Sequence, residues 1–568
     1  MMIKNLISFG MVAAISMAAI AQPSAVVPLF NEVPGYGVSQ KLAQYKKVKL
    51  TADLSSLSQT EKDALYFLIE AAKGVDPIFW MQTYGKDYTK FFNNCESKDL
   101  EDFIRLNYGP YDRLNNDAPF VANIGPKPLG ANYYDENIDL SKYAQMPEDM
   151  QKDQYGSVRA NQEGELESIP YFMEYQAELN GISNNLVQAM IRMQSIDMDF
   201  SQFIEKRINA LNQGGYDESD IAWLGLKNSK LDIIIGPIES YDDKLKGIRT
   251  SFESYVLVRD LTWSKKLSKY LGELPNLQKN LPVDSAYKTE TPGGDGDQLA
   301  VFDAVYYAGD CNSGSKTIAV NLPNSEELQK NVGTRRTQIR NVMKAKFDEI
   351  VLPISAFIIA PEQQKHIKFD AFFNNVMFHE VAHGLGIKNL VGQSGTVKDA
   401  LGPLHNTIEE CKADVLGLWM VTQMVDKKEL PGDLADYYVT FVSSIFRSVR
   451  FGAGSAHGKA NMIVYNTLEE EGAIVRDKNG KYKVDIIKMR KSIANLAGRL
   501  LKLQGDGNSQ TVSEYITKYA AIANNLKTDI DQINNQNIPV DIRFEQGQNV
   551  LGLSKPGPFV PSPPKPRK

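Results

Sequence analysis

Residues 378 to 384 read Phe-His-Glu-Val-Ala-His-Gly and place two histidines four positions apart, with a glutamate directly after the first. On a helix, positions i and i+4 lie one above the other, so His379 and His383 can point at one metal ion. Glu380 can then reach a water molecule on that metal. This spacing is typical of a zinc site that activates water for attack on a carbonyl group.

The residues before the motif predict the helix that such a site needs. Phe372 and Val376 fall on the same stripe as the two histidines, so the ligands continue an apolar face. Gly384 and Gly386 follow and provide a helix stop. The alternative is an exposed helix face that carries two histidines and a glutamate by chance, and the apolar stripe argues against it.

A catalytic zinc ion takes three protein ligands and keeps one position open for water. The segment TIEECKAD, residues 407 to 414, offers the third ligand. Glu410, Ala413, Asp414 and Gly417 share one helical face, so Glu410 can bind zinc while Asp414 orients a ligand histidine. Thr407 and Glu410 also fit a capping box, which would make Glu410 structural. Spacing alone does not decide between these two interpretations.

Length and charge limit the classes of protein that are possible. The chain has 568 residues, which exceeds what one compact core holds, so we expect two lobes or domains. Hydrophobic residues make up 43% and charged residues 23%, a balance typical of globular proteins. The net charge of -6 argues against nucleic acid as a partner, because no basic excess exists to neutralise phosphates.

The first 21 residues predict a secretory signal peptide. Lys4 precedes an apolar run from Leu6 to Ile20, and Ala19-Ile20-Ala21 offers small residues for cleavage before Gln22. An uncleaved anchor helix is the alternative, against which the short run argues. No other segment predicts a membrane span, so we expect an exported, periplasmic or secreted protein without a membrane partner after cleavage.

Three cysteines, Cys95, Cys311 and Cys411, are an odd number and lie far apart. A disulfide framework or a cysteine zinc site is therefore not expected.

Periodicity predicts a mixed chain whose second half is helical. Helical patterns cover Ser58–Ala72, Pro170–Ile208 and the chain from Asn341 to about Ile533. Strands are expected at Leu231–Pro237, Ser254–Val258, Leu299–Tyr307 and Thr317–Val320. Residues 22 to about 50 read as a loosely ordered lead-in, residues 109–170 as mostly loop and residues 288–296 as a loop.

The EECKAD segment at 409–414, together with the HExxH helix, resembles the dipeptidyl peptidase III family of zinc exopeptidases, which pairs HExxGH with an EECRAE-type motif. The resemblance implies one Zn²⁺ per chain, bound by His379, His383 and Glu410. It also implies that Glu409 and Asp414 support these ligands from behind.

Other stretches carry the resemblance over residues 230 to 475. They are IGPIESYD at 235–242, SFES at 251–254, NLPN at 321–324 and AHGKA at 456–460. The resemblance implies that Glu239, Glu253, Asn321 and Asn324 bind the amino terminus of a peptide. It further implies that Tyr241 hydrogen-bonds the scissile region and that His457 stabilises the transition state.

Each of these residues also has a plain structural interpretation. Glu239 and Tyr241 can cap and pack a strand end, and Asn321 and Asn324 can be turn residues around a proline. His457, in a glycine-rich stretch, can be a loop histidine.

The chain departs from the family pattern at three positions. The helix has HExxH rather than the longer HExxGH. Asn461 stands where the family has an arginine, and Asp414 where it has a glutamate.

The resemblance implies an α+β fold with two lobes around a wide cleft: a mixed lower lobe with a β-barrel and a mainly helical upper lobe that carries zinc. The expected division is a signal peptide 1–21, lower lobe 22–259, upper-lobe segment 260–298, lower-lobe strands 299–350, zinc-binding upper lobe 351–537, return segment 538–553 and proline-rich tail 554–568.

The expected function is release of dipeptides from the amino terminus of short peptides, with Glu380 as the general base and Tyr241 or His457 as hydrogen-bond donors. The alternatives are another zinc peptidase, namely an aminopeptidase or oligoendopeptidase, and a non-catalytic peptide-binding protein. An intact Glu380 argues against the last, because a binding protein can lose it without losing zinc. We expect a monomer or weak dimer.

Overall fold

A computed structural model describes residues 29–289 and 298–559. The expected signal peptide, most of the loop at 288–296 and the last nine residues of the proline-rich tail lie outside these ranges. No helix in the described ranges has both the length and the apolar character needed to cross a bilayer.

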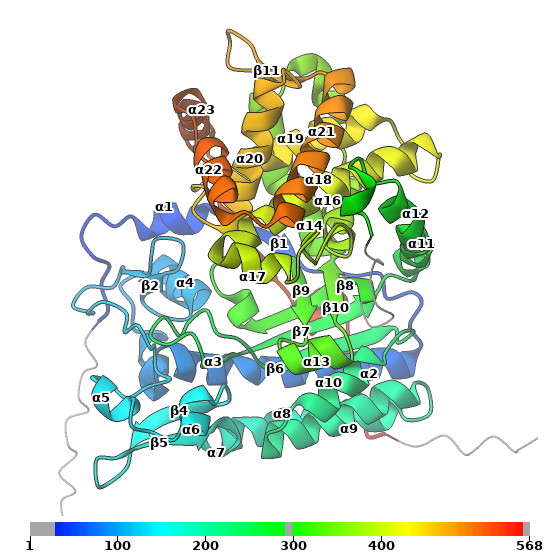
Figure 1. Ribbon diagram of the computed structural model, residues 1–568. Helices are drawn as coiled ribbons and strands as arrows, with labels where there is room; N and C mark the ends of the chain where they lie inside the picture. The colour runs from blue at the N-terminus through cyan, green and yellow to red at the C-terminus, as the bar shows by residue number, and fades with distance from the viewer. Residues whose placement is uncertain (1–28, 290–297, 560–568) are drawn as a thin grey trace, which may run out of the picture.

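An open five-stranded sheet, half of a barrel, forms the centre of the lower lobe (Figure 1). The strands are β6 (Leu231–Glu239), β7 (Ser251–Arg259), β8 (Gln298–Gly309), β10 (Arg335–Ile339) and β9 (Ala319–Leu322), in that spatial order. All neighbours are antiparallel except β8 and β10. Strand β7 is buried along its whole length, which is expected of a sheet covered on both faces. Strand β9 forms an edge, and it borders the upper lobe.

Helices α2 (Gln59–Lys73) and α3 (Val75–Thr83) pack against the sheet, and α8 (Gln176–Met193) and α9 (Met198–Gln213) lie below them (Figure 1). The helix predicted at Ser58–Ala72 is confirmed as α2, and its apolar face is fully buried at Leu65, Leu68 and Ile69. A complete capping box between Ser58 and Glu61 starts this helix.

The sequence interpretation was wrong in two places. Residues 38–49 are ordered, as α1 (Val38–Ala43) and β1 (Tyr45–Lys49), because β1 pairs in parallel with the distant β13 (Asp541–Glu545). Strand β10 was not predicted, because its sequence RRTQI lacks an apolar alternation. Arg335 lies buried there, paired with Asp232 at 2.5 Å and placed over the Trp223 ring, so charge pairing replaces the apolar signal.

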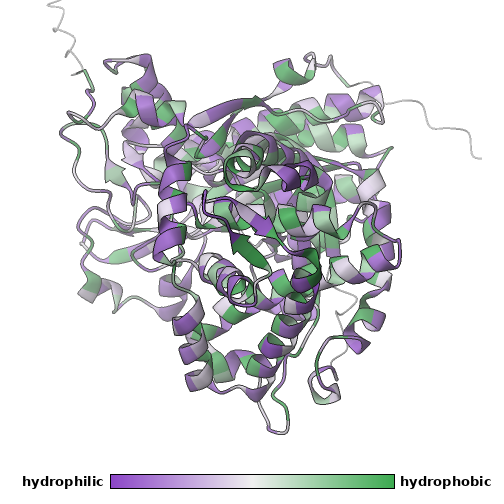
Figure 2. Cartoon of the chain, turned by 90° about the horizontal axis from the view of Figure 1, so that it is seen from above, coloured by the Kyte–Doolittle hydropathy of each residue, from purple (hydrophilic) through white to green (hydrophobic). Residues whose placement is uncertain are grey.

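Helices build the upper lobe around a core that extends from Trp263 to Ile538. They are α16 (Phe369–Ala382), α18 (His405–Asp426), α19 (Leu434–Val449), α20 (Ala456–Glu470) and α21 (Ile486–Asp506), with a small hairpin of β11 (Ile474–Arg476) and β12 (Tyr482–Val484). Viewed from above, these helices carry hydrophilic and hydrophobic residues on different faces (Figure 2). The chain passes from the lower core to the upper one within α14 (Arg340–Lys346), where Val342 packs in the lower core and Met343 in the upper one, and it returns to the lower core with Ile542 of β13.

Helices α16 and α18 approach each other through Gly417. A Cβ atom at this position would lie 2.8 Å from the backbone nitrogen of His379 and 2.9 Å from the carbonyl carbon of Phe378. Real Cβ atoms do not come so close to a backbone, so only glycine allows this crossing. The approach places the zinc-motif helix directly against the helix that carries Glu410.

We expect Gly417→Ala to lower the free energy of unfolding by about 1–3 kcal/mol, because the added methyl group forces two backbones apart. The matched control is Gly181→Ala in α8, where no atom lies within 4 Å of the added carbon. That variant should be more stable by about 0.5–1 kcal/mol, since alanine favours a helix. Urea unfolding of both variants measures this, and equal stability would contradict the close approach.

Candidate metal centre and cleft

Two histidines of α16 are each held by a carboxylate of α18. His379 Nδ1 lies 2.7 Å from Asp414 Oδ1, and His383 Nδ1 lies 2.9 Å from Glu409 Oε1. A carboxylate behind Nδ1 fixes the tautomer and leaves Nε2 to face a metal ion. The two Nε2 atoms lie 3.3 Å and 3.8 Å from the same atom, Glu410 Oε2.

Glu410 Oε2 is buried and makes no well-aligned hydrogen bond within the described residues. Besides the two Nε2 atoms, His457 Nδ1 lies 3.0 Å from it. Several imidazole nitrogens around one carboxylate oxygen form a donor set that fits a divalent cation such as zinc. The capping-box interpretation of Glu410 is wrong, because α18 begins at His405 and Thr407 caps nothing.

The donor atoms of His379, Glu410 and His457 lie within 4.8 Å of one another, so these three also form a compact candidate set. We favour His379, His383 and Glu410 as the ligand set, because a carboxylate outside this set orients the imidazole of His383, whereas none in the described ranges does so for His457. His383 has a carboxylate behind its Nδ1, whereas His457 turns its Nδ1 to Glu410 and has a side chain that is 66% exposed. Metal-binding histidines are normally held by such a second hydrogen bond.

Several supporting residues were not predicted as such. Lys412 Nζ donates to the carbonyl oxygens of Ala382 and Leu385, at 3.1 Å and 2.9 Å, and so caps the end of α16. It also pairs with Glu409 at 2.7 Å, and Gln504 donates to the other oxygen of Glu409 at 2.9 Å. Because both oxygens of Glu409 already have partners, this residue orients His383 and does not bind the metal.

Asn461, which stands where an arginine was expected, donates to Asp414 Oδ2 at 2.8 Å. It therefore holds the carboxylate that orients His379. The shorter side chain at this position is turned inward to the metal centre.

Glu380 faces the cleft between the lobes. Its Oε2 lies 3.7 Å from Nε of Arg336, a residue of strand β10 in the lower lobe. Because β10 itself was not predicted, neither was this contact. The two lobes therefore meet at the residue proposed as the general base.

Two cavities meet at the metal centre. The first has a volume of about 570 Å³ and is lined by the predicted residues Glu239, Tyr241, Glu253, Asn321 and Asn324, and by Asp310. The second has about 820 Å³ and is lined by His379, His383 and Glu410, among others. Glu380, His457, Asn321 and Arg336 border both. The structure thus brings all predicted site residues to one cleft, with Asp414 directly behind it.

Two carboxylates of the first cavity, Glu239 and Glu253, form no ion pair with any residue that the structure describes. Glu253 is 2% exposed, and its Oε1 has no hydrogen-bond partner in the described ranges. Burial, with Asp310 and Glu239 nearby, raises the pKa of Glu253 well above its usual range. Burial also raises the pKa of Glu239. Such groups favour a cationic ligand, because a positive charge stabilises their ionised form.

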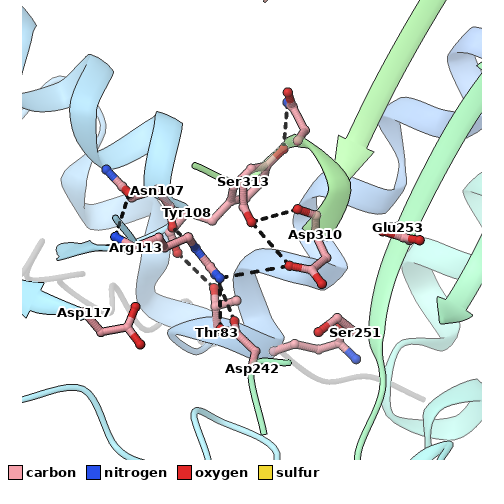
Figure 3. A network of polar contacts seen from close by, with 12 residues as sticks. Thr83, Asn107, Tyr108, Arg113, Asp117, Asp242, Ser251, Glu253, Asp310 and Ser313 are labelled. Carbon is pink, nitrogen blue, oxygen red and sulfur yellow. Dashed lines mark hydrogen bonds and ion pairs between the residues drawn. The ribbon is translucent and has the colours of Figure 1, made fainter. Parts of the chain in front are cut away.

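Asp310 belongs to a buried polar network that the sequence did not indicate (Figure 3). Arg113 donates two hydrogen bonds to Asp242, at 2.9 Å and 2.8 Å, and Lys127 contacts the same carboxylate at 2.7 Å. Asp310 lies 4.0 Å from Arg113 and accepts a hydrogen bond from Ser313. Burial and the charge of Asp242 raise the pKa of Asp310 to about 6.

The remaining predicted residues lie at the mouth of the first cavity. Tyr241 is 76% exposed, directly after β6. Asn324 donates to the carbonyl oxygen of Ile238 at 3.0 Å and so ties the end of β9 to the end of β6. Asn321 pairs with Arg336 across β9 and β10.

Comparisons with known proteins identify relatives in both sequence and fold. The sequence model of peptidase family M49 matches residues 142–395. The structure of dipeptidyl peptidase III from Caldithrix abyssi is similar with a TM-score of 0.85 and 32% identity, over 89% of this chain and 98% of that one. The enzyme from Corallococcus sp. strain EGB gives a TM-score of 0.73 and 32% identity, over 89% and 96%.

Two curated sequences are also similar. Nudix hydrolase 3 of Arabidopsis thaliana is 29% identical, over 90% of this chain and 74% of its own length. Dipeptidyl peptidase 3 of Nematostella vectensis is 23% identical, over 35% of this chain and 30% of its own length.

The fold and the site define a metallopeptidase with two lobes. The chain belongs to the dipeptidyl peptidase III family, peptidase family M49, whose members are zinc enzymes.

We expect His383→Ala and Glu410→Gln to abolish stoichiometric zinc binding, because each removes a ligand. Asp414→Asn should weaken zinc affinity by about 10- to 100-fold, since it removes only the support of His379. Zinc content after dialysis against a graded chelator measures both effects.

The controls are His457→Ala and His405→Ala, which should retain zinc. His405 lines the second cavity, and within the described ranges its one side-chain hydrogen bond joins Nδ1 to Asn406 Oδ1 at 3.3 Å. Loss of zinc from His457→Ala together with its retention in His383→Ala would assign the third ligand to His457.

Proposed function

We propose that the protein is a zinc-dependent dipeptidyl peptidase that releases two residues from the amino terminus of short peptides. The observation that carries this proposal is the acid-lined first cavity beside the metal centre. Its carboxylates Glu239 and Glu253 suit a free ammonium group, and the cavity shares Glu380 and His457 with the metal centre.

In this reaction each residue of the site has a separate role. His379, His383 and Glu410 would hold zinc, which when bound supplies the Lewis acidity that makes a neighbouring water acidic. Glu380 takes the proton of the attacking water and passes it to the leaving amine. His457 donates to the oxygen that becomes negative. Tyr241, which is exposed on the lower lobe, supports the same region when the lobes close.

The amino terminus of the substrate sets the length of the product. Glu239 and Glu253 bind the ammonium group, while Asn321 and Asn324 contact the backbone beside it. Glu239, Glu253 and Asn321 lie on strands of the lower lobe, and Asn324 directly follows β9, so the sheet fixes these groups relative to one another. Closure of the lobes then sets their distance from the metal centre, and cleavage after two residues follows from the distance in the closed form.

Glu380→Gln tests the mechanism. The variant should bind zinc normally and lose about 10²- to 10⁴-fold in kcat, because it lacks a general base. The control is Glu362→Gln, at an exposed position of the upper lobe outside the cleft. Near-normal activity of the zinc-loaded Glu380→Gln variant would exclude this role.

Mass spectrometry of the products from unblocked pentapeptides tests the product length. Dipeptides from the amino terminus are expected, and Nα-acetylated peptides should not be cut. Single amino acids would indicate an aminopeptidase, and internal fragments an oligoendopeptidase. Stoichiometric zinc with no cleavage would indicate a binding protein.

Peptide binding should tighten as the pH rises from 5 to 7. Asp310, with a pKa of about 6, is neutral at pH 5 and negative at pH 7, whereas a peptide amino group keeps its proton in this range. We expect Kd for the Glu380→Gln variant to fall roughly three- to tenfold. Isothermal titration calorimetry measures this Kd, and Asp310→Asn should reduce the change of Kd with pH. An equal pH dependence for the Nα-acetylated peptide would contradict the assignment.

A further inference from the structure

The second cavity has the opposite charge to the first. Arg336, Lys388, Lys398 and His405 lie in its lining, and we call it the basic cavity. Its carboxylates are all engaged: Glu380 with Arg336, Glu410 with the histidines, and Glu409 with His383 and Lys412. A ligand entering this cavity therefore meets one basic group, Lys398, that pairs with none of the carboxylates of the lining.

Lys398 is the most available of these groups. It is exposed on the short helix α17 (Val397–Leu401) and makes no ion pair or side-chain hydrogen bond with any residue in the described ranges. An exposed lysine elsewhere on a surface is ordinary, but this one lines a cavity that also contains the metal ligands. Its charge therefore acts within reach of a bound substrate.

The backbone around Lys398 is fixed. The amide of Val397 donates to the carbonyl oxygen of Lys388 at 2.9 Å, and the amide of Leu390 donates to Gly395 at 3.0 Å. Val397 and Leu401 are buried in the upper core. The lysine thus extends from an anchored element, and the same pairing places Lys388 beside it.

A peptide at the metal centre consequently lies between an acidic and a basic cavity, which share Asn321, Arg336, Glu380 and His457 as a common border. The acidic cavity suits the ammonium group. An arginine or lysine side chain in the basic cavity would meet like charges, which disfavours it, whereas a carboxylate would gain an ion pair.

We propose that Lys398 is a specificity-determining residue, which with Lys388 and His405 binds an acidic side chain close to the scissile bond. The inference rests on the proposed function in naming the substrate class: short peptides with a free amino terminus and an aspartate or glutamate among the first three residues. The basic cavity is the subsite for that carboxylate.

The test uses unblocked pentapeptides that differ only by Glu, Gln or Lys at position one, two or three. For the wild-type enzyme we expect kcat/KM to be about tenfold higher with Glu than with Gln at one of these positions, and lowest there with Lys. The advantage should shrink as the salt concentration rises from 0.05 M to 0.5 M, because the pair is partly exposed to solvent.

Variants assign the effect to the residue. Lys398→Gln should remove most of the advantage of Glu while leaving kcat/KM for the Gln peptide unchanged, and Lys398→Glu should shift the preference to Lys. The matched control is Lys365→Gln, an exposed lysine of the upper lobe outside both cavities, which should behave as wild type. A loss for all peptides alike would assign Lys398 a structural role and overturn the inference.

Measurements of peptide binding test this inference independently of the proposed function. The Kd of the Glu and Gln peptides for the Glu380→Gln variant requires no turnover. Tighter binding of the Glu peptide, lost in the Lys398→Gln double variant, supports the basic subsite even if the products are not dipeptides. Equal Kd values for Glu and Gln at all three positions, or tightest binding of Lys, would overturn the inference even if dipeptides are released.

Discussion

The close contact of α16 with α18 is the constraint on which the site depends. Gly417 lets the two backbones approach, and this brings Glu409, Glu410 and Asp414 of one helix opposite the two histidines of the other. Each carboxylate has a separate task at this distance: two hold an imidazole from behind, and one faces both Nε2 atoms. A larger separation of the two helices would break all three contacts between carboxylate and histidine together, because they depend on the same pair of rigid helices.

The lower lobe contributes charge rather than metal ligands. Its sheet carries Arg336 to Glu380 and carries Glu239 and Glu253 to the neighbouring cavity. Strands β7 and β10 are hydrogen-bonded on both sides, and the edge strand β6 is hydrogen-bonded to β7, so these side chains have fixed positions relative to one another. The upper lobe supplies the metal centre and the basic cavity. The chemistry therefore takes place where a rigid acidic surface meets a helical one, which explains why neither lobe alone forms the site.

The sequence predicted the elements and site residues that follow from the spacing of residues close together in the chain. The HExxH helix, the face that carries Glu410 and Asp414, and the strands β6 to β9 all follow from local periodicity. The roles of Glu253, Tyr241 and His457 came only from the family resemblance. Asp310, Arg113 and Arg336 were missed, because their roles depend on pairs such as Arg113–Asp242, which are far apart in the chain. A paired buried charge leaves no pattern in a single sequence, since either partner alone reads as an ordinary surface residue.

The two kinds of buried charge in the lower lobe show which groups serve structure and which serve binding. Asp242 has two cationic partners, and these hold its pKa below the usual range despite burial. Glu253, on the same side of the cleft, has no cationic partner in the described ranges and a free oxygen. A protein gains no stability from such a group, because burying an uncompensated carboxylate is unfavourable. Its retention in a cavity beside a metal centre is explained if the missing cation arrives with the substrate.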